Sequence, residues 1–382
     1  MAAYTDVTTD RLQELLSDLA SRTSIQQAII ALESGDRSFR WIGATGETDS
    51  EGTQVREETP FFLASIDKLF NATIVMKLSE SGRLDLDDAI CTYLPNTLTR
   101  GLHQLGGVDY SERITIRHLL SHTSGLADWL EDYPKGGPSL IDRVLDEGDM
   151  ALTIEDVAAV VRDQLKPHFP PQDPAAKRRK ARYSDTNYML LIGIIEVLTG
   201  QPLPQVHEEM LFEPLGLRHT YFPGLSEPID PTPEPMILRA KGRPLHIPDL
   251  MRSVRGMYST AADTLTFLRQ FVRNKVFQDP GTLASMQKQW NRFGFPLDRV
   301  ALRSPGWPIE YGLGIMRFRL PRAFTPLHPM PPVLGHTGST GCWLFYCPQW
   351  DMLLSGSVDE VTAGAVPYRV VPKILKILHS FH

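Results

Sequence analysis

The chain contains few cysteines, no long apolar run and no excess of positive charge. Its three cysteines among 382 residues, Cys91, Cys342 and Cys347, are too few and odd in number to support a disulfide framework. No stretch reaches the roughly 18 apolar residues of a membrane span. The net charge of -6 argues against a nucleic-acid partner. The polar, acidic segment 1–10 lacks the pattern of a secretory signal, so a cytoplasmic location is expected.

Three kinds of site are also disfavoured by the residues that are missing. No Gly-x-Ser-x-Gly elbow occurs, which argues against an ordinary α/β-hydrolase. His118 and His122 have a spacing that can bind zinc, but Leu119 stands where a zinc protease has glutamate, so both histidines are interpreted as structural. The acidic run 85–88 is interpreted as a capped turn rather than a calcium site. No metal or cofactor is expected.

The order of predicted elements indicates an α/β (α+β) fold. Strand patterns occur near both ends of the chain, and helical patterns dominate the middle. The strands are expected at 25–32, 37–44, 311–318, 333–335, 342–347 and 352–358, and the helices at 9–22, 65–81, 114–121, 154–165, 188–198 and 371–382. We therefore expect an antiparallel sheet flanked by helices, with an inserted, mostly helical domain. The predicted α/β domain comprises 1–84 and 285–382, the helical domain comprises 85–284, and the active site lies in the cleft between them.

The first candidate catalytic group is Ser65, followed three residues later by Lys68. Residues three apart share one face of a helix, so the lysine can reach the serine hydroxyl. Burial lowers the pKa of a lysine, and a neutral amine could then take the serine proton. The pattern alone has little specificity, because Ser285 and Lys288 repeat it. Taken singly, each copy is more simply a solvated helical turn.

The second candidate is Tyr183, which begins the segment Tyr183-Ser184-Asp185. A tyrosine close to a cation loses its phenolic proton more easily, and it could act as base and then as acid. The simpler alternative is that Ser184 or Asp185 caps the helix that follows. Both interpretations can hold together, because a capped turn would present the tyrosine rigidly.

The third candidate is the glycine-rich segment 335–339, which contains His336, Thr337, Gly338 and Ser339. Its small residues would let a substrate approach the edge of a strand. The amide of Ser339 could pair with that of Ser65 to bind an oxyanion. Taken alone, the segment is more simply a hairpin turn.

In chain order, Ser-x-x-Lys, Tyr-Ser-Asp and His-Thr-Gly together resemble the serine β-lactamase and penicillin-binding protein superfamily. The segments "LASIDKLFNATIVMKLSESGRLDLDDAICTYLP", "ITIRHLLSHTSGLADW" and "ARYSDTNYMLLIGIIEVLTG" are most similar to its class C β-lactamase branch, which includes the family VIII carboxylesterases. The resemblance implies that Ser65 is the nucleophile, that Lys68 and Tyr183 shuttle protons, and that the amides of Ser65 and Ser339 bind the oxyanion. It also excludes Ser285, which follows the tyrosine motif.

Two departures from the family pattern bear on the substrate. Asp185 stands where asparagine is more usual, and an ionised carboxylate cannot donate a hydrogen bond. His336 stands where lysine is frequent, which weakens the grip on a substrate carboxylate. Both favour a carboxylesterase that hydrolyses small or medium, neutral esters. The alternatives are a D-amino-acid peptidase or β-lactamase, an acyltransferase, and a non-catalytic scaffold that kept the fold. The partner expected is a small ester or amide, and the sequence predicts no oligomeric state.

Two further features near the motifs have two interpretations each. The basic run Lys177-Arg178-Arg179-Lys180 is more often a solvated loop, but its closeness to Tyr183 suggests that it rims the site. Four aromatic residues could line an acyl pocket or pack in the core; they are Trp129, Tyr258, Trp307 and Trp343.

Overall fold

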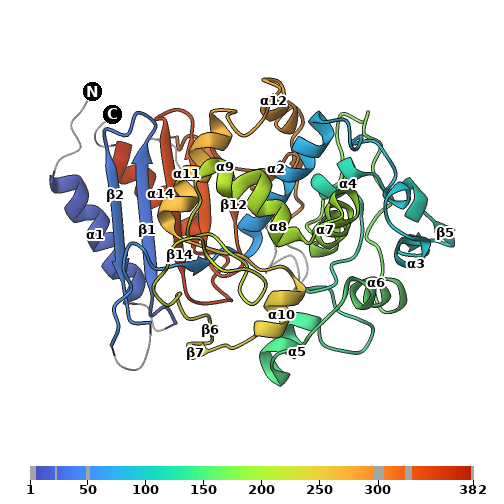
Figure 1. Ribbon diagram of the computed structural model, residues 1–382, viewed down its shortest axis with the longest axis horizontal. Coiled ribbons are helices and arrows are strands. Elements are labelled where there is room, and N and C mark those ends of the chain that lie inside the picture. Colours follow the sequence, from blue (N-terminus) through green and yellow to red (C-terminus); the bar gives the residue numbers. More distant parts are fainter. Residues whose placement is uncertain (1–5, 22–23, 49–51, 296–304, 323–328, 380–382) are drawn as a thin grey trace.

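An antiparallel sheet of eight strands forms one side of the molecule (Figure 1). The computed structural model describes residues 6–21, 24–48, 52–295, 305–322 and 329–379. The strand order is β2-β1-β14-β13-β12-β11-β10-β9, which confirms the expected fold class. The strands are β1 (Ala28–Ser34), β2 (Arg40–Thr45), β9 (Asn291–Arg292), β10 (Glu310–Tyr311), β11 (Met316–Phe318), β12 (Val333–Thr337), β13 (Trp343–Cys347) and β14 (Met352–Val358).

Both faces of this sheet are covered by helices. Helices α1 (Asp6–Ala20) and α14 (Pro367–His379) contact each other on one face, and α11 (Ala261–Val272) covers the other. Successive residues of a strand point to opposite faces. Accordingly, Ile30 packs in the core under α1 and α14, while Ile29 packs in the core shared with α11. This two-sided burial explains why β1 is apolar throughout instead of alternating.

Most of the remaining helices gather on the other side of the molecule, although α9 (Glu213–Leu215) lies beside α11 and α12 (Thr282–Met286) lies between the two sides (Figure 1). The others are α3 (Asn96–Thr99), α4 (Ile116–Leu120), α5 (Leu140–Glu147), α6 (Ile154–Asp163), α7 (Asp185–Thr199), α8 (Leu203–His207) and α10 (Pro248–Ser253). Three short ribbons pair β3 (Phe61–Phe62) with β8 (Tyr258–Ser259), β4 (Gln104–Leu105) with β5 (Val108–Asp109), and β6 (Arg239–Ala240) with β7 (Arg243–Pro244).

Helix α2 (Asp67–Glu80) connects the two sides of the molecule. It contacts α7 in the helical part and β12 in the sheet. Ten of its residues are buried, so it is apolar on nearly all faces and lacks an amphipathic pattern. The first residues of α2 therefore lie where both parts of the chain can contribute side chains. The domain boundaries expected from the sequence stay a prediction.

The closing helix begins earlier than its sequence pattern indicates. The apolar pattern places its start at residue 371, which would leave Pro372 in the first turn. Helix α14 starts at Pro367, so Pro372 lies inside it, and residues 380–382 lie outside the described part of the chain. Val370, Val371, Ile374 and Leu375 are buried together, and this packing outweighs the hydrogen bond that the proline cannot donate.

Within the described residues, no single helix is long and apolar enough to cross a membrane. Among the helices of these described ranges, only α7 joined to the segment Leu203–Leu215 has the necessary length and apolar content, and this pair is bent by 78°.

Candidate active site

Ser65 lies on a strained turn immediately before α2. Residues Ala64–Ile66 form a 3-10 turn, and the α-helix begins at Asp67, two residues after the serine. Ala64 has a φ of 43°, in the left-handed region that L-residues rarely adopt. Such strain often occurs at functional sites, where the surrounding structure holds it in place. With Ala64 and Ile66 buried, the turn leaves Ser65 partly accessible.

Lys68 joins Ser65 to Asp185, two residues that are far apart in the sequence. Its Nζ donates to Ser65 Oγ at 3.1 Å and forms an ion pair with Asp185 Oδ1 at 2.7 Å. Asp67 Oδ1 lies farther away, at 3.9 Å. The ammonium also lies 5.4 Å from the ring centroids of Tyr183 and of Tyr188. The structure thus brings Ser65, Lys68, Tyr183 and Asp185 together.

The charge state of Lys68 differs from the sequence expectation. Burial is the largest single influence and lowers the pKa of Lys68, as expected for a buried amine. The negative charge of Asp185, together with Tyr183 and Asp67, outweighs it and raises the pKa well above its ordinary value. The expectation of a lowered pKa is therefore wrong, because it took no account of a carboxylate in contact with the amine. The resting form of Lys68 is an ammonium.

Tyr183 lies beside the lysine with its hydroxyl buried. The residue is only 6% exposed, and the hydroxyl completes no hydrogen bond of standard geometry with another described residue. Burial raises the pKa of Tyr183 well above 10, whereas the nearby Lys68 and Ser65 act in the opposite direction. The group is therefore a neutral phenol at rest, and the lysine charge stabilises its phenolate.

Asp185 is the first residue of α7, and a second carboxylate caps this helix. Asp128 Oδ2 accepts the backbone N–H of Asp185 at 3.2 Å. Ser184 occupies the N-cap position, but its hydroxyl donates to the carbonyl of Ala127 at 3.0 Å and caps nothing. The capping expected of Ser184 or Asp185 thus comes from Asp128, leaving the Asp185 side chain for Lys68.

His336 lies on β12 with its ring fully buried. Its Nδ1 donates to the carbonyl of Thr337 at 2.8 Å, so Nε2 accepts from the hydroxyl of Tyr311 at 2.9 Å. Burial, followed by the charge of Lys68, lowers the pKa of His336 to about 3. The ring is consequently neutral, and both of its nitrogens are engaged by the protein.

The residues after His336 bring the end of β12 against the turn that carries Ser65. A side chain on Gly338 would put its Cβ 2.7 Å from Ala64 Cβ, which shows how closely the two segments approach. The Thr337 hydroxyl is 2.8 Å from that of Tyr368 and points into the core. Ser339 follows on an exposed turn. Neither its amide nor that of Ser65 donates to an acceptor within the described residues.

The second Ser-x-x-Lys segment lacks these features. Ser285 is exposed on α12, and its hydroxyl donates to the carbonyl of Thr282 at 2.7 Å. Lys288 is exposed as well. Nothing in this segment resembles the contact between Lys68 and Ser65.

The basic run and the aromatic residues have different surroundings. Arg179 donates to Asn291 Oδ1 at 3.0 Å, which fastens the basic run to strand β9, while Lys177, Arg178 and Lys180 are exposed. Trp129 and Trp343 belong to the buried core, whereas Trp307 is 40% exposed and stacks on Phe295. The two buried tryptophans are therefore core residues.

Sequence reasoning missed the proximity of His122 to this site. Its ring centroid is 4.4 Å from that of Tyr183. The sequence signal that could have indicated it is the run Ser121-His122-Thr123-Ser124, four consecutive polar residues that directly follow α4. All four are buried. His118, by contrast, points to Thr115 and to the carbonyl of Gln172, in keeping with a structural residue.

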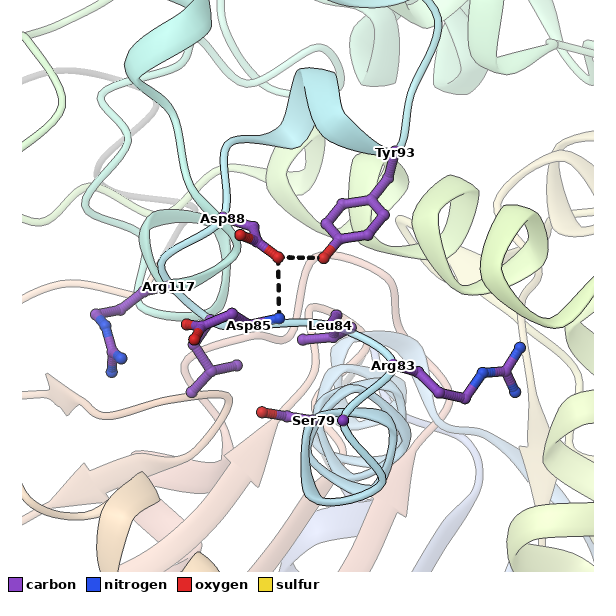
Figure 2. Close-up of a pocket in the computed structure, with 9 residues that line it drawn as sticks. Ser79, Arg83, Leu84, Asp85, Asp88, Tyr93 and Arg117 are labelled. Carbon is purple, nitrogen blue, oxygen red and sulfur yellow. Dashed lines mark hydrogen bonds between the residues drawn. The ribbon is translucent and has the colours of Figure 1, made fainter.

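A cavity of about 510 Å³ lies at the opposite end of α2 from Ser65 (Figure 2). In it, Asp88 accepts the hydroxyl of Tyr93 and the backbone N–H of Asp85. Arg83 and Arg117 point away from each other, and Arg117 pairs with Asp87. This acidic segment is the capped turn that the sequence indicated.

Comparisons with known proteins agree with the fold and the motifs. A model of the Beta-lactamase family matches residues 25–355. Esterase EstB of Burkholderia gladioli is 29% identical over 323 residues, covering 77% of this chain and 76% of that protein. A D-stereospecific amidohydrolase from Streptomyces sp. has a TM-score of 0.70 and 26% identity, covering 96% of this chain and 97% of that one. EstCE1, a hydrolase with promiscuous acyltransferase activity, has a TM-score of 0.69 and 24% identity, covering 97% and 98%.

The fold and these relatives define a serine hydrolase. The chain belongs to the Beta-lactamase family, which confirms the resemblance seen in the sequence.

Proposed function

We propose that this serine hydrolase is a carboxylesterase that acts through an acyl-enzyme on Ser65, with small or medium esters as substrates. The observation that carries the proposal is the position of Lys68, whose Nζ is within hydrogen-bonding distance of both Ser65 Oγ and Asp185 Oδ1. A serine is a weak nucleophile until a neighbouring base takes its proton. The esterase relative from Burkholderia gladioli supports the choice of an ester.

The proton path starts from an ammonium, which cannot itself accept a proton. Lys68 first gives a proton to the Asp185 carboxylate, 2.7 Å away. The neutral amine then takes the proton of Ser65 as Oγ attacks the ester carbonyl. Tyr183 passes a proton to the departing alcohol, stabilised as a phenolate by the re-formed ammonium. A water molecule attacks the acyl-enzyme, and the same groups act in reverse.

The oxyanion of the tetrahedral intermediate is held by the amides of Ser65 and Ser339. Both are free of other acceptors among the described residues, as donors to a developing charge must be. The close approach of Gly338 to Ala64 supports this pairing, because it fixes one amide-bearing turn against the other. Thr337 and His336 hold that turn from within the core.

The charges around Ser65 favour an uncharged acyl group. Among the described residues, Lys68 is the only cation in contact with Ser65, and it is already paired with Asp185. His336 is neutral and engaged. A substrate carboxylate would therefore meet Asp185 and Asp67 without a free counter-ion. We accordingly propose esters over β-lactams and over peptides with a free C-terminus.

A second candidate is the hydrolysis of D-amino-acid amides. The Streptomyces neighbour is a D-stereospecific amidohydrolase at 26% identity, which favours this alternative. The carboxylate of Asp185 is partly exposed and could accept a hydrogen bond from a substrate amine. Acyl transfer to an alcohol is a variant of the same chemistry.

The three unpaired cysteines support a reducing compartment such as the cytoplasm.

Intact mass spectrometry after incubation with activated acyl donors tests the proposal. With p-nitrophenyl butyrate, the wild-type chain should gain one butyryl group, and Ser65→Ala should gain none. Ser285→Ala is the matched control and should acylate normally. Turnover of the same ester, a D-alanyl anilide and nitrocefin ranks the substrate classes, and added alcohol reveals acyl transfer. A folded wild-type chain that reacts with no donor and with no fluorophosphonate would instead indicate a non-catalytic scaffold.

A further inference from the structure

We propose that His122 is a positioning residue for Tyr183, a role that rests on the function proposed above. His122 lies in the loop after α4, with its backbone in the left-handed region at a φ of 54°. Its carbonyl accepts the N–H of Arg182 at 3.0 Å, and its Nδ1 accepts the N–H of Ser184 at 3.2 Å. One residue thus binds the chain on both sides of Tyr183.

The hydrogen bonds around His122 fix which ring nitrogen carries the proton. Ser124 Oγ accepts the N–H of Leu126 at 3.2 Å, so its own proton goes to Asn187 Oδ1 at 2.7 Å. The amide nitrogen of Asn187 must then donate to His122 Nδ1, 3.0 Å away. Because Nδ1 accepts two donors, it carries no proton, and the proton is on Nε2. Burial keeps the pKa of His122 well below its ordinary value, in agreement with a neutral ring.

The ring of His122 also limits the movement of the tyrosine ring. Its centroid lies 4.4 Å from that of Tyr183, with 33° between the planes, and Tyr311 meets it edge-on at 4.6 Å. Nε2 has no hydrogen-bond partner among the described residues. Among the described residues, Nδ1 is therefore the one ring atom of His122 that forms hydrogen bonds, and its loss removes the acceptor of the Ser184 N–H. The His122 carbonyl would still hold Arg182, so the loss loosens one side of the turn 182–184.

The consequence is kinetic, because Tyr183 can exchange protons only while its hydroxyl stays close to the side chains of Lys68 and Ser65, which lie near enough to lower its pKa. Its position relative to Lys68 depends on the backbone of residues 182–184 and on the packing of its ring. A displacement of about 1 Å between reacting groups can lower a rate by about 100-fold. Removing the Nδ1 acceptor should therefore slow proton transfer while leaving substrate binding nearly intact.

The test compares His122→Leu, His122→Asn and Tyr183→Phe on a p-nitrophenyl ester. Asparagine places Oδ1 close to the position of Nδ1 and tolerates the left-handed backbone, whereas leucine has a similar shape and no acceptor. We expect His122→Leu to lower kcat by about 10- to 100-fold with little change in KM. His122→Asn should stay within a few-fold of wild type. His103→Leu, at another fully buried histidine, should lower stability and leave kcat unchanged.

The double variant His122→Leu/Tyr183→Phe separates positioning from general damage. If His122 acts through Tyr183, the double variant should be no slower than Tyr183→Phe alone. The inference would be overturned if the fold-losses of the two single variants multiplied in the double variant. It would also be overturned if His122→Leu kept the wild-type kcat, or if His122→Asn were as slow as His122→Leu. If His122→Leu does not fold, His122→Gln replaces it, because the glutamine amide lies beyond the position of Nδ1 and cannot accept the same hydrogen bonds. The results expected for His122→Leu then apply to His122→Gln.

Failure of this inference can be told from failure of the proposed function. An absence of acyl-Ser65 in the wild-type chain contradicts the function itself. A Tyr183→Phe variant that acylates at the wild-type rate contradicts the role of Tyr183 and, with it, the inference. Acylation that depends on Tyr183 and is indifferent to His122 contradicts the inference alone.

Discussion

At the scale of single residues, the replacement of an amide by a carboxylate at position 185 changes the chemistry of the lysine. An asparagine would leave the buried Lys68 with Asp67 as its nearest anion, at 3.9 Å. Asp185 instead lies 2.7 Å from Nζ and holds the proton on the amine. The same contact makes Asp185 the immediate acceptor when the amine has to be freed. Burial also raises the pKa of Asp67 to about 6, so the local charge becomes more negative above that pH.

The substitution Asp185→Asn tests this control of the lysine. A neutral amide no longer stabilises the ammonium, so the pKa of Lys68 should fall and the neutral amine should appear at lower pH. In the variant the amine has to lose its proton to solvent instead of to Asp185, so the rise of acylation rate with pH should begin at a lower pH than in wild type. The measurement is kcat/KM for a p-nitrophenyl ester across the pH range, with Asp67→Asn for comparison. If the rise of kcat/KM with pH stays where it is in wild type, a group other than Lys68 controls it. Loss of activity at every pH would show that Asp185 is an indispensable proton acceptor.

At the scale of elements, most of the secondary structure and the three motifs could be predicted from the sequence. Apolar periodicity located β1, β2, β12, β13 and β14 and the helices α1, α2, α4, α6, α7 and α14, but it did not indicate α11 or β9. The single strand expected at 311–318 is wrong, because the chain turns at Gly314, with a φ of 74°, and forms β10 and β11 instead. The Ser-x-x-Lys segment lies beside the Tyr-Ser-Asp segment as the resemblance implied. The strained turn at Ala64 left no sequence signal, since alanine is common in helices. The charge state of Lys68 and the role of Asp128 as a cap depend on contacts between distant segments, which periodicity does not contain.

The end of β12 packs against the turn that carries Ser65, and a substitution at Gly338 tests this contact. In Gly338→Ala the new Cβ would meet Cys342 Sγ at 2.4 Å, Ala64 Cβ at 2.7 Å and the carbonyl of Leu63 at 3.0 Å. Because atoms on both sides are too close, the end of β12 must move away from the turn that carries Ser65. Separating the amides of Ser65 and Ser339 should lower kcat by about 10²-fold or more, the usual effect of losing an oxyanion donor. Steady-state kinetics with the ester measure it.

Gly137→Ala is the matched control, because its Cβ would meet only Pro134 at an ordinary 3.5 Å. Its activity should equal that of wild type. A Gly338→Ala variant with unchanged kcat and an unchanged melting temperature would show that this contact does not hold the oxyanion site.

At the scale of the whole molecule, buried neutral histidines tie stability to pH. His103, His122, His207 and His336 are all fully buried, and burial lowers the pKa of each. In the unfolded chain a histidine takes up a proton below a pKa of about 6.5. The folded chain resists that protonation, so unfolding takes up protons and the free energy of unfolding falls as the pH is lowered. The raised pKa of Asp67 acts in the opposite direction.

His207 gives the cleanest single measure of this effect, because it is remote from Ser65 in its contacts. Its Nε2 bonds to Asn71 Oδ1 at 2.8 Å, and burial lowers its pKa to about 3. Its stabilising contribution is therefore complete above about pH 6.5 and falls by about 1.4 kcal/mol for each pH unit below that. His207→Gln keeps a donor for Asn71 and does not titrate. Urea unfolding at about pH 7.5 and about pH 5.5 should show a smaller loss of stability in the variant than in wild type, by about 1.4 kcal/mol. Equal losses in the two proteins would mean that His207 is already charged in the folded chain.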